Sequence, residues 1–199
     1  MNRETWLNEA IDKHLIDYFD NVAYLSKRCG GHELRDIRDK IKVSCGFPAG
    51  VRGGNNKAIG VCWSQRASTG GYIEIFISPV IDSSTRVLDI LIHELIHAIL
   101  PDGEGHGSNF RKCAIKLGLE GKMTATTCGA LLLNTLNDWI TNLGEYPHAS
   151  MNTGERKKQT TRMVKHQCNE CGAIWRMSRR YSPSICPCCH EQYTYNGGE

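Results

Sequence analysis

The residues of this chain that could do chemistry begin with a pair of histidines near its middle. The segment His93-Glu94-Leu95-Ile96-His97 follows the H-E-x-x-H pattern. Residues four apart lie on one face of an α-helix, so two imidazoles can bind one cation while Glu94 handles a proton of metal-bound water. This geometry suits zinc. Two core histidines beside a carboxylate are the alternative, but ionisable groups in so apolar a helix cost several kcal/mol unless they are paired or bind metal.

A catalytic zinc site needs a third protein ligand and an open fourth position. The metzincin spacing would put that ligand at position 103, which is Gly103. A glutamate further along the chain is a second option, and Glu120 is the one rough candidate. His106 is the better candidate, because the glycines that flank it in 103–107 let the chain reverse and bring an imidazole back over the helix.

The sequence also suggests roles for three residues near the candidate ligands: Phe110, Glu104 and Asp89. We expect Phe110 to anchor the next helix in the core and Glu104 to be a solvated loop charge. Asp89 lies one turn before His93, where it either fixes the tautomer of an imidazole or is simply a charge in the first turns of the helix.

A second metal site is indicated near the C-terminus by two Cys-x-x-Cys pairs. Cys168-Asn-Glu-Cys171 and Cys186-Pro-Cys-Cys189 are separated by fourteen residues, a spacing typical of a structural zinc site with four thiolate ligands. Metal binding would then supply the folding free energy of this short polar segment. Cys188 and His190 could compete, but the two-residue spacing favours Cys186 and Cys189.

Basic and aromatic residues surround this cysteine module. Cations pair with phosphates and rings stack on bases, so the mixture suits nucleic acid. A solvated ribbon whose tryptophan packs on the cysteine pairs is the alternative. The candidate contact residues are Trp175, Arg176, Arg179, Arg180, Lys157 and Lys158.

The elements that must position these residues can be outlined from periodicity. Apolar spacing predicts an N-terminal helix over 3–29, ended by Gly30 and Gly31, and β-branched runs predict a short antiparallel sheet within 41–78. A helix over 85–100, capped from 82–84 and ended by Pro101, carries the histidine pair, and another follows over 108–117.

Charge and composition divide the chain. Residues 1–150 carry a net charge of −1 and residues 151–199 a net charge of +4, and the polar run 144–161 between them is typical of a linker. The longest apolar stretch, 88–100, contains four ionisable residues, so no membrane span is expected. An acidic start argues against a targeting signal, which favours an intracellular, reducing location. The remaining cysteines are then buried or free thiols: Cys29, Cys45, Cys62, Cys113 and Cys128.

The motifs together resemble a known family. Gly60-Val61-Cys62, the run 70–75, the histidine motif and Glu104-Gly105-His106-Gly107 through Phe110 are similar to the SprT-like metallopeptidases, which include Spartan, and in particular to their compact phage and bacterial members. The resemblance implies that His93, His97 and His106 hold zinc and that Glu94 is catalytic. It also implies protein substrates trapped or crosslinked on DNA, with a preference for single strands, and a location on DNA in the cytoplasm.

The sequence therefore predicts an α+β, zincin-like SprT metallopeptidase domain over 1–145 with its core at 41–125, a basic flexible linker over 146–162, and a zinc ribbon over 163–199. We expect one catalytic and one structural zinc ion. The predicted function is a zinc endopeptidase that acts on DNA-bound proteins, as in DNA–protein crosslink repair. A DNA-binding adaptor with purely structural metals and a hydrolase of another amide, such as cell-wall peptide, are the competing hypotheses.

Overall fold

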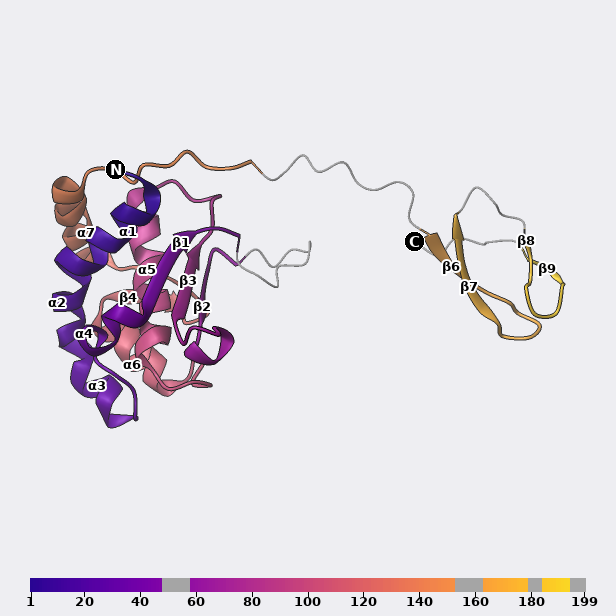
Figure 1. Cartoon of the computed structure of the whole chain (residues 1–199), viewed down its shortest axis with the longest axis horizontal. Helices are drawn as coiled ribbons and strands as arrows, with labels where there is room; N and C mark the ends of the chain where they lie inside the picture. The colour runs from indigo at the N-terminus through magenta and orange to yellow at the C-terminus, as the bar shows by residue number, and fades with distance from the viewer. Residues whose placement is uncertain (48–57, 153–162, 179–183, 194–199) are drawn as a thin grey trace. The chain divides into compact units, whose positions relative to one another are not determined.

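The computed structural model describes residues 1–47, 58–152, 163–178 and 184–193 (Figure 1). The chain forms two compact units, unit 1 over Met1–Thr153 and unit 2 over Gly154–Glu199. The mixed α+β composition expected from the sequence is confirmed. Within the described residues, every helix is too short or too polar to cross a membrane.

Unit 1 begins with a helical stretch that is not one regular helix, contrary to expectation. α1 (Arg3–Ala10), a π-helical turn (Ile11–Leu15), α2 (Ile16–Phe19), a 3-10 turn (Asp20–Val22) and α3 (Ala23–Arg28) follow one another. Leu7, Ile11, Leu15 and Phe19 are all buried. A four-residue spacing drifts by about 40° per step on an α-helix, and the wider π turn offsets this drift and keeps these side chains on the core.

Two short helical turns, α4 (Leu34–Ile37) and a 3-10 turn (Arg38–Lys40), lead into a three-stranded sheet. In the sheet, β3 (Ile73–Ile77) lies between β1 (Ile41–Cys45) and β2 (Gly60–Trp63). In the sequence, a 3-10 turn (Gln65–Ala67) follows β2 and precedes β3. β2 pairs with β3 antiparallel as expected, but β1 pairs with β3 in parallel. The expectation of an antiparallel sheet was wrong for β1, because the chain over 46–72 is long enough for β3 to return between β1 and β2 in the direction of β1.

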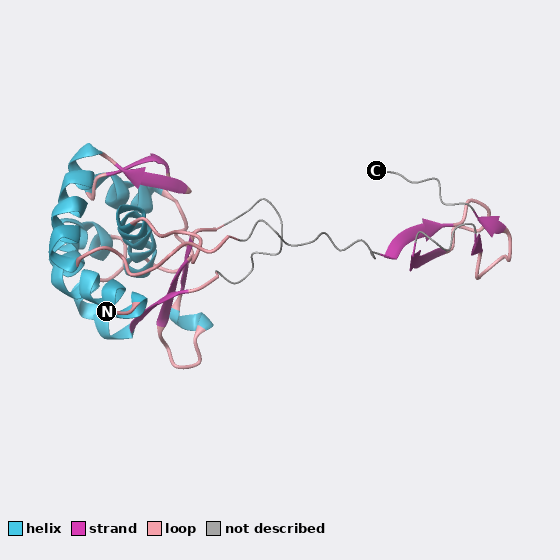
Figure 2. Ribbon diagram, turned by 90° about the horizontal axis from the view of Figure 1, so that it is seen from above, coloured by secondary structure: helices cyan, strands magenta, loops and turns pink. Residues whose placement is uncertain are grey.

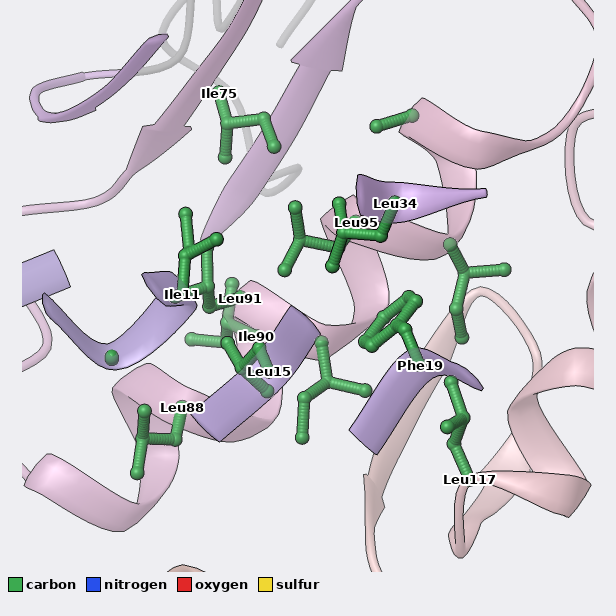
Figure 3. Packing of buried hydrophobic residues seen from close by; sticks show 14 of the residues in the cluster. Ile11, Leu15, Phe19, Leu34, Ile75, Leu88, Ile90, Leu91, Leu95 and Leu117 are labelled. Carbon is green, nitrogen blue, oxygen red and sulfur yellow. The ribbon is translucent and has the colours of Figure 1, made fainter. Parts of the chain in front are cut away.

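The core of unit 1 is built around α5 (Ser84–Ile99), which carries the histidine pair. Its first turn is capped by the Ser83 hydroxyl, which accepts from the backbone N–H of Arg86. Figure 2 shows the longer helices on one side of the sheet. In Figure 3, Leu88, Leu91 and Leu95 of α5 meet side chains of the N-terminal helices and of β3. This apolar packing around α5 fixes the positions of the polar residues that the helix carries.

Four further elements complete unit 1. α6 (Ser108–Lys116) ends one residue before the expected boundary, and its Phe110 is fully buried as expected. A hairpin of β4 (Leu119–Lys122) and β5 (Ala125–Cys128) and then α7 (Ala130–Leu143) follow. The sequence patterns did not predict these last three elements.

The chain after α7 stays on unit 1 for several residues. Tyr146 is buried against Trp6, and its N–H donates to the Ser84 hydroxyl over 2.8 Å. The N–H of Met151 donates to the carbonyl of Pro79 over 2.8 Å. Residues 146–151 therefore pack on unit 1, although we expected them to begin the linker.

Unit 2 is a small ribbon of two hairpins. β6 (Met163–Gln167) pairs antiparallel with β7 (Ile174–Ser178), and β8 (Ser184–Ile185) pairs antiparallel with β9 (Gln192–Tyr193). Each Cys-x-x-Cys pair lies in or next to the turn of one hairpin.

Candidate active site and metal centres

Three imidazoles meet at one point of unit 1. His93 and His97 come from consecutive turns of α5, and His106 comes from the loop before α6. The Nε2 atom of His106 lies 3.1 Å from Nε2 of His93 and 3.2 Å from Nε2 of His97. Ligands on a tetrahedron about 2.0–2.1 Å from zinc are about 3.3–3.4 Å apart, so the three nitrogens fit one zinc ion.

The loop that supplies His106 reverses the chain directly after α5. Gly103 and Gly105 have φ angles of +89° and +54°, a region that glycine adopts without strain. The carboxylate of Glu104 accepts hydrogen bonds from the backbone and the side-chain amide of Asn109, at 3.0 and 3.1 Å. Glu104 therefore ties the loop to the start of α6, and the expectation of a solvated charge was wrong.

A buried phenyl ring supports the three imidazoles. The ring centroid of Phe110 lies 4.6–4.9 Å from the centroids of His93, His97 and His106. Because α6 and the core hold Phe110 in place, its contacts limit how far each imidazole can rotate.

The environment keeps these imidazoles in the form that binds metal. Burial, with the neighbouring imidazoles adding to it, lowers the pKa of His93 to about 3 and that of His97 to about 4. Burial also lowers the pKa of His106. Neutral imidazole is the ligand form, so all three residues offer a lone pair at neutral pH.

Glu94 lies beside the histidines with its side chain enclosed by β2. A Cβ atom at Gly60 would come within 2.5 Å of Glu94 Oε1, so β2 approaches α5 closely at this point. Burial raises the pKa of Glu94 to about 8 and that of the nearby Cys62 to about 12. A carboxyl group in such a place binds and holds a proton readily.

Asp89 forms its side-chain hydrogen bond with Arg86 rather than with an imidazole. It is buried and pairs with Arg86, one turn earlier on α5. The Nδ1 atom of His93 instead lies 2.8 Å from the hydroxyl oxygen of Thr126 on β5. Sequence reasoning missed Thr126 and Arg86. The short β-prone run Ala125-Thr126-Thr127-Cys128 was the one weak signal for the strand.

The three histidines and Glu94 line a cleft with a volume of about 1160 Å³. One wall is β2, which lies at an edge of the sheet. The other walls are the loop 101–106 and the tip of the β4–β5 hairpin. Glu120, the other candidate for a third ligand, is exposed and is neither in the histidine group nor in the cleft lining.

Unit 2 brings its four candidate cysteines together. Sγ of Cys168 lies 3.6 Å from Sγ of Cys189, and Sγ of Cys171 lies 3.6 Å from Sγ of Cys186. These separations are too long for disulfides and close to the roughly 3.8 Å between sulfurs that share a zinc ion at about 2.3 Å.

Cys188 and His190, which could have competed for this site, contribute backbone N–H groups next to it. The N–H of Cys188 points at Sγ of Cys186 over 3.4 Å. The N–H of Cys189, the N–H of Cys188 and the neighbouring thiols lower the pKa of Cys186 to about 6. His190 has a φ angle of +61°, and its N–H closes the turn on the carbonyl of Cys186. The four-sulfur group therefore consists of Cys168, Cys171, Cys186 and Cys189.

The candidate nucleic-acid residues divide between the two faces of the ribbon. Trp175 is half-buried and stacks on the buried His166, at a centroid distance of 5.6 Å. Arg176 is exposed on the opposite face, directly across from the exposed Lys165 of β6. Four further candidates lie outside the described residues: Lys157, Lys158, Arg179 and Arg180.

The comparisons with known proteins agree with this geometry. Residues 45–129 match the model of the SprT-like family. This part of the chain is similar to the SprT-like family. The match confirms the resemblance seen in the sequence, and it indicates a metallopeptidase-type function. The histidine group lies within the residues that match the family model, and both it and the cysteine group are compatible with zinc. Searches among curated proteins and among solved structures found no match.

The raised pKa of Glu94 predicts a pH-dependent stability difference in the metal-free protein. The folded chain holds the Glu94 proton up to about pH 8, whereas the unfolded chain releases it near 4.5. Wild-type protein should therefore lose stability relative to Glu94→Gln as the pH rises between these values, by up to about 1.4 kcal/mol per pH unit. Urea unfolding with a chelator, followed by the NMR signals of α5, measures the difference. Equal differences at pH 5 and pH 7.5 would contradict it.

Proposed function

We propose that this protein is a zinc endopeptidase of zincin-like fold that cleaves proteins bound to or crosslinked to DNA. The observation that supports the reaction is the convergence of three neutral imidazoles beside a buried carboxyl group at the floor of an open cleft. Zinc bound there would keep one position open, lower the pKa of a water molecule and polarise a peptide carbonyl.

Glu94 is the group that moves protons in this proposal. Glu94 is 6% exposed and lies next to His93 on α5. It accepts a proton from the attacking water and then gives it to the nitrogen of the leaving amine. In the metal-free chain burial favours the protonated carboxyl; the charge of a zinc ion on the neighbouring histidines would favour the carboxylate that accepts this proton.

β2 is the proposed binding edge for the substrate chain. Its residues pair with β3 on one side and line the cleft along Gly60–Trp63. An extended peptide can add to such an edge through main-chain hydrogen bonds, with little demand on its side chains. This arrangement fits an enzyme that acts on many proteins and takes its selectivity from where it is bound.

The exposed face of unit 2 supports a role in DNA binding. Lys165 and Arg176 lie opposite each other in the β6–β7 ladder, and like charges in this position destabilise a strand pair. A phosphate between them would remove the repulsion and release counterions. A ribbon held on single-stranded DNA would raise the local concentration of DNA-bound protein near the cleft.

Replacing Glu94 with Gln tests the catalytic role. We expect cleavage of casein or histone to fall by at least about 10²-fold, because the proton acceptor is lost, while zinc content stays near two ions per chain. Glu120→Gln, an exposed carboxylate outside the cleft lining, is the control and should cleave like wild type. Wild-type cleavage by Glu94→Gln would refute the assigned role, and a wild-type protein that binds DNA but cleaves nothing would favour the adaptor.

The DNA contact is tested by salt dependence. We expect binding of single-stranded DNA to weaken steeply as salt increases, and Lys165→Gln combined with Arg176→Gln to reduce the slope of log K against log salt by about 0.7, the value for one phosphate of a single strand. Lys122→Gln on β4 is the control. An affinity that does not change between low and physiological salt would contradict the proposal. Faster proteolysis with added DNA would argue against a hydrolase of cell-wall peptide.

A further inference from the structure

The outer nitrogen of His93 has a specific partner. Its Nε2 faces His106, and its Nδ1 lies 2.8 Å from Thr126 Oγ1. A neutral imidazole carries one proton. If Nε2 offers its lone pair to a metal, the proton must be on Nδ1, so the Thr126 hydroxyl oxygen is the acceptor.

The backbone of Thr126 is held by Arg86 of α5. Arg86 Nη1 donates to the Thr126 carbonyl over 3.0 Å and also pairs with the Asp89 carboxylate. Arg86, Asp89 and His93 follow at helical spacings of three and four, so they form one stripe along α5. The helix that carries His93 therefore also holds the strand whose side chain orients His93.

The burial of this group makes its geometry well defined. Thr126 is 4% exposed and Asp89 is 2% exposed. Leaving the buried Asp89 carboxylate without its partner is costly, so this pairing keeps Arg86 of α5 against Thr126 of β5. Among the described residues, His93 is the one histidine of the three with such a partner for its outer nitrogen.

We propose that Thr126 is a positioning residue for His93: its hydroxyl oxygen fixes the tautomer whose Nε2 faces the metal position, and the Arg86–Asp89 pair holds Thr126 in place. This inference rests on the proposed function in one respect, the binding of a divalent metal by the three histidines. It assigns to the β4–β5 hairpin a role in metal affinity, in addition to its place as a wall of the cleft.

The test compares Thr126→Val with Thr126→Ser in the full chain. Valine keeps the shape and the strand preference but removes the acceptor, whereas serine keeps it. We expect valine to raise the zinc dissociation constant of the histidine site by about 10- to 100-fold, and serine to leave it within about threefold. Competition against a chelator measures the constants, and a His106→Ala variant identifies the ribbon site, which should not change in any variant.

A second measurement needs no variant that could fail to fold. Two-bond proton–nitrogen NMR spectra of the metal-free wild-type protein, with histidine labelled by nitrogen-15, report the tautomer of His93. We expect the proton on Nδ1.

Two results would overturn the inference. One is a proton on Nε2 of His93 in the wild-type protein, and the other is a folded Thr126→Val variant that binds zinc within twofold of wild type. A wild-type chain with no zinc beyond the ribbon would refute the proposed function instead, and the tautomer would still decide the inference.

Discussion

The convergence of three imidazole nitrogens is the constraint on which the candidate site of unit 1 depends. At separations of 3.1 and 3.2 Å, these nitrogens repel if all three present a lone pair, unless a cation lies among them. The fold sets these separations through the regular turn of α5, the reversal at Gly103 and Gly105, and the ring of Phe110. Burial removes the other solution, protonation of the imidazoles, because it lowers their pKa values. A divalent metal is the ligand that satisfies all of these conditions.

The cysteine group of unit 2 also brings candidate metal ligands together, but it has four of them instead of three. Four sulfurs close every position of a tetrahedron, whereas three histidines leave one position open. A closed site holds a short ribbon together, and an open one can bind water or substrate. The proposed division of labour, chemistry in unit 1 and attachment to DNA in unit 2, thus corresponds to the number of protein ligands at each site.

Local patterns were enough to predict the residues that converge. The helix of His93 and His97, the return of His106 and the cysteine pairs depend on spacing and on glycine, which are visible in the sequence. The parallel pairing of β1 and the β4–β5 hairpin depend on contacts between distant segments. Thr126 lies 33 residues from His93, so no spacing rule connects them. The burial of Tyr146 likewise depends on Trp6, far away in the sequence.

Diffraction at the zinc absorption edge from crystals of the full chain tests the central claim most directly. The account predicts an anomalous peak about 2.0–2.1 Å from the Nε2 atoms of His93, His97 and His106, and a second peak among the four sulfurs of unit 2. A map with the peak in unit 2 but none among the imidazoles would contradict it, because the ribbon peak shows that zinc was present during purification.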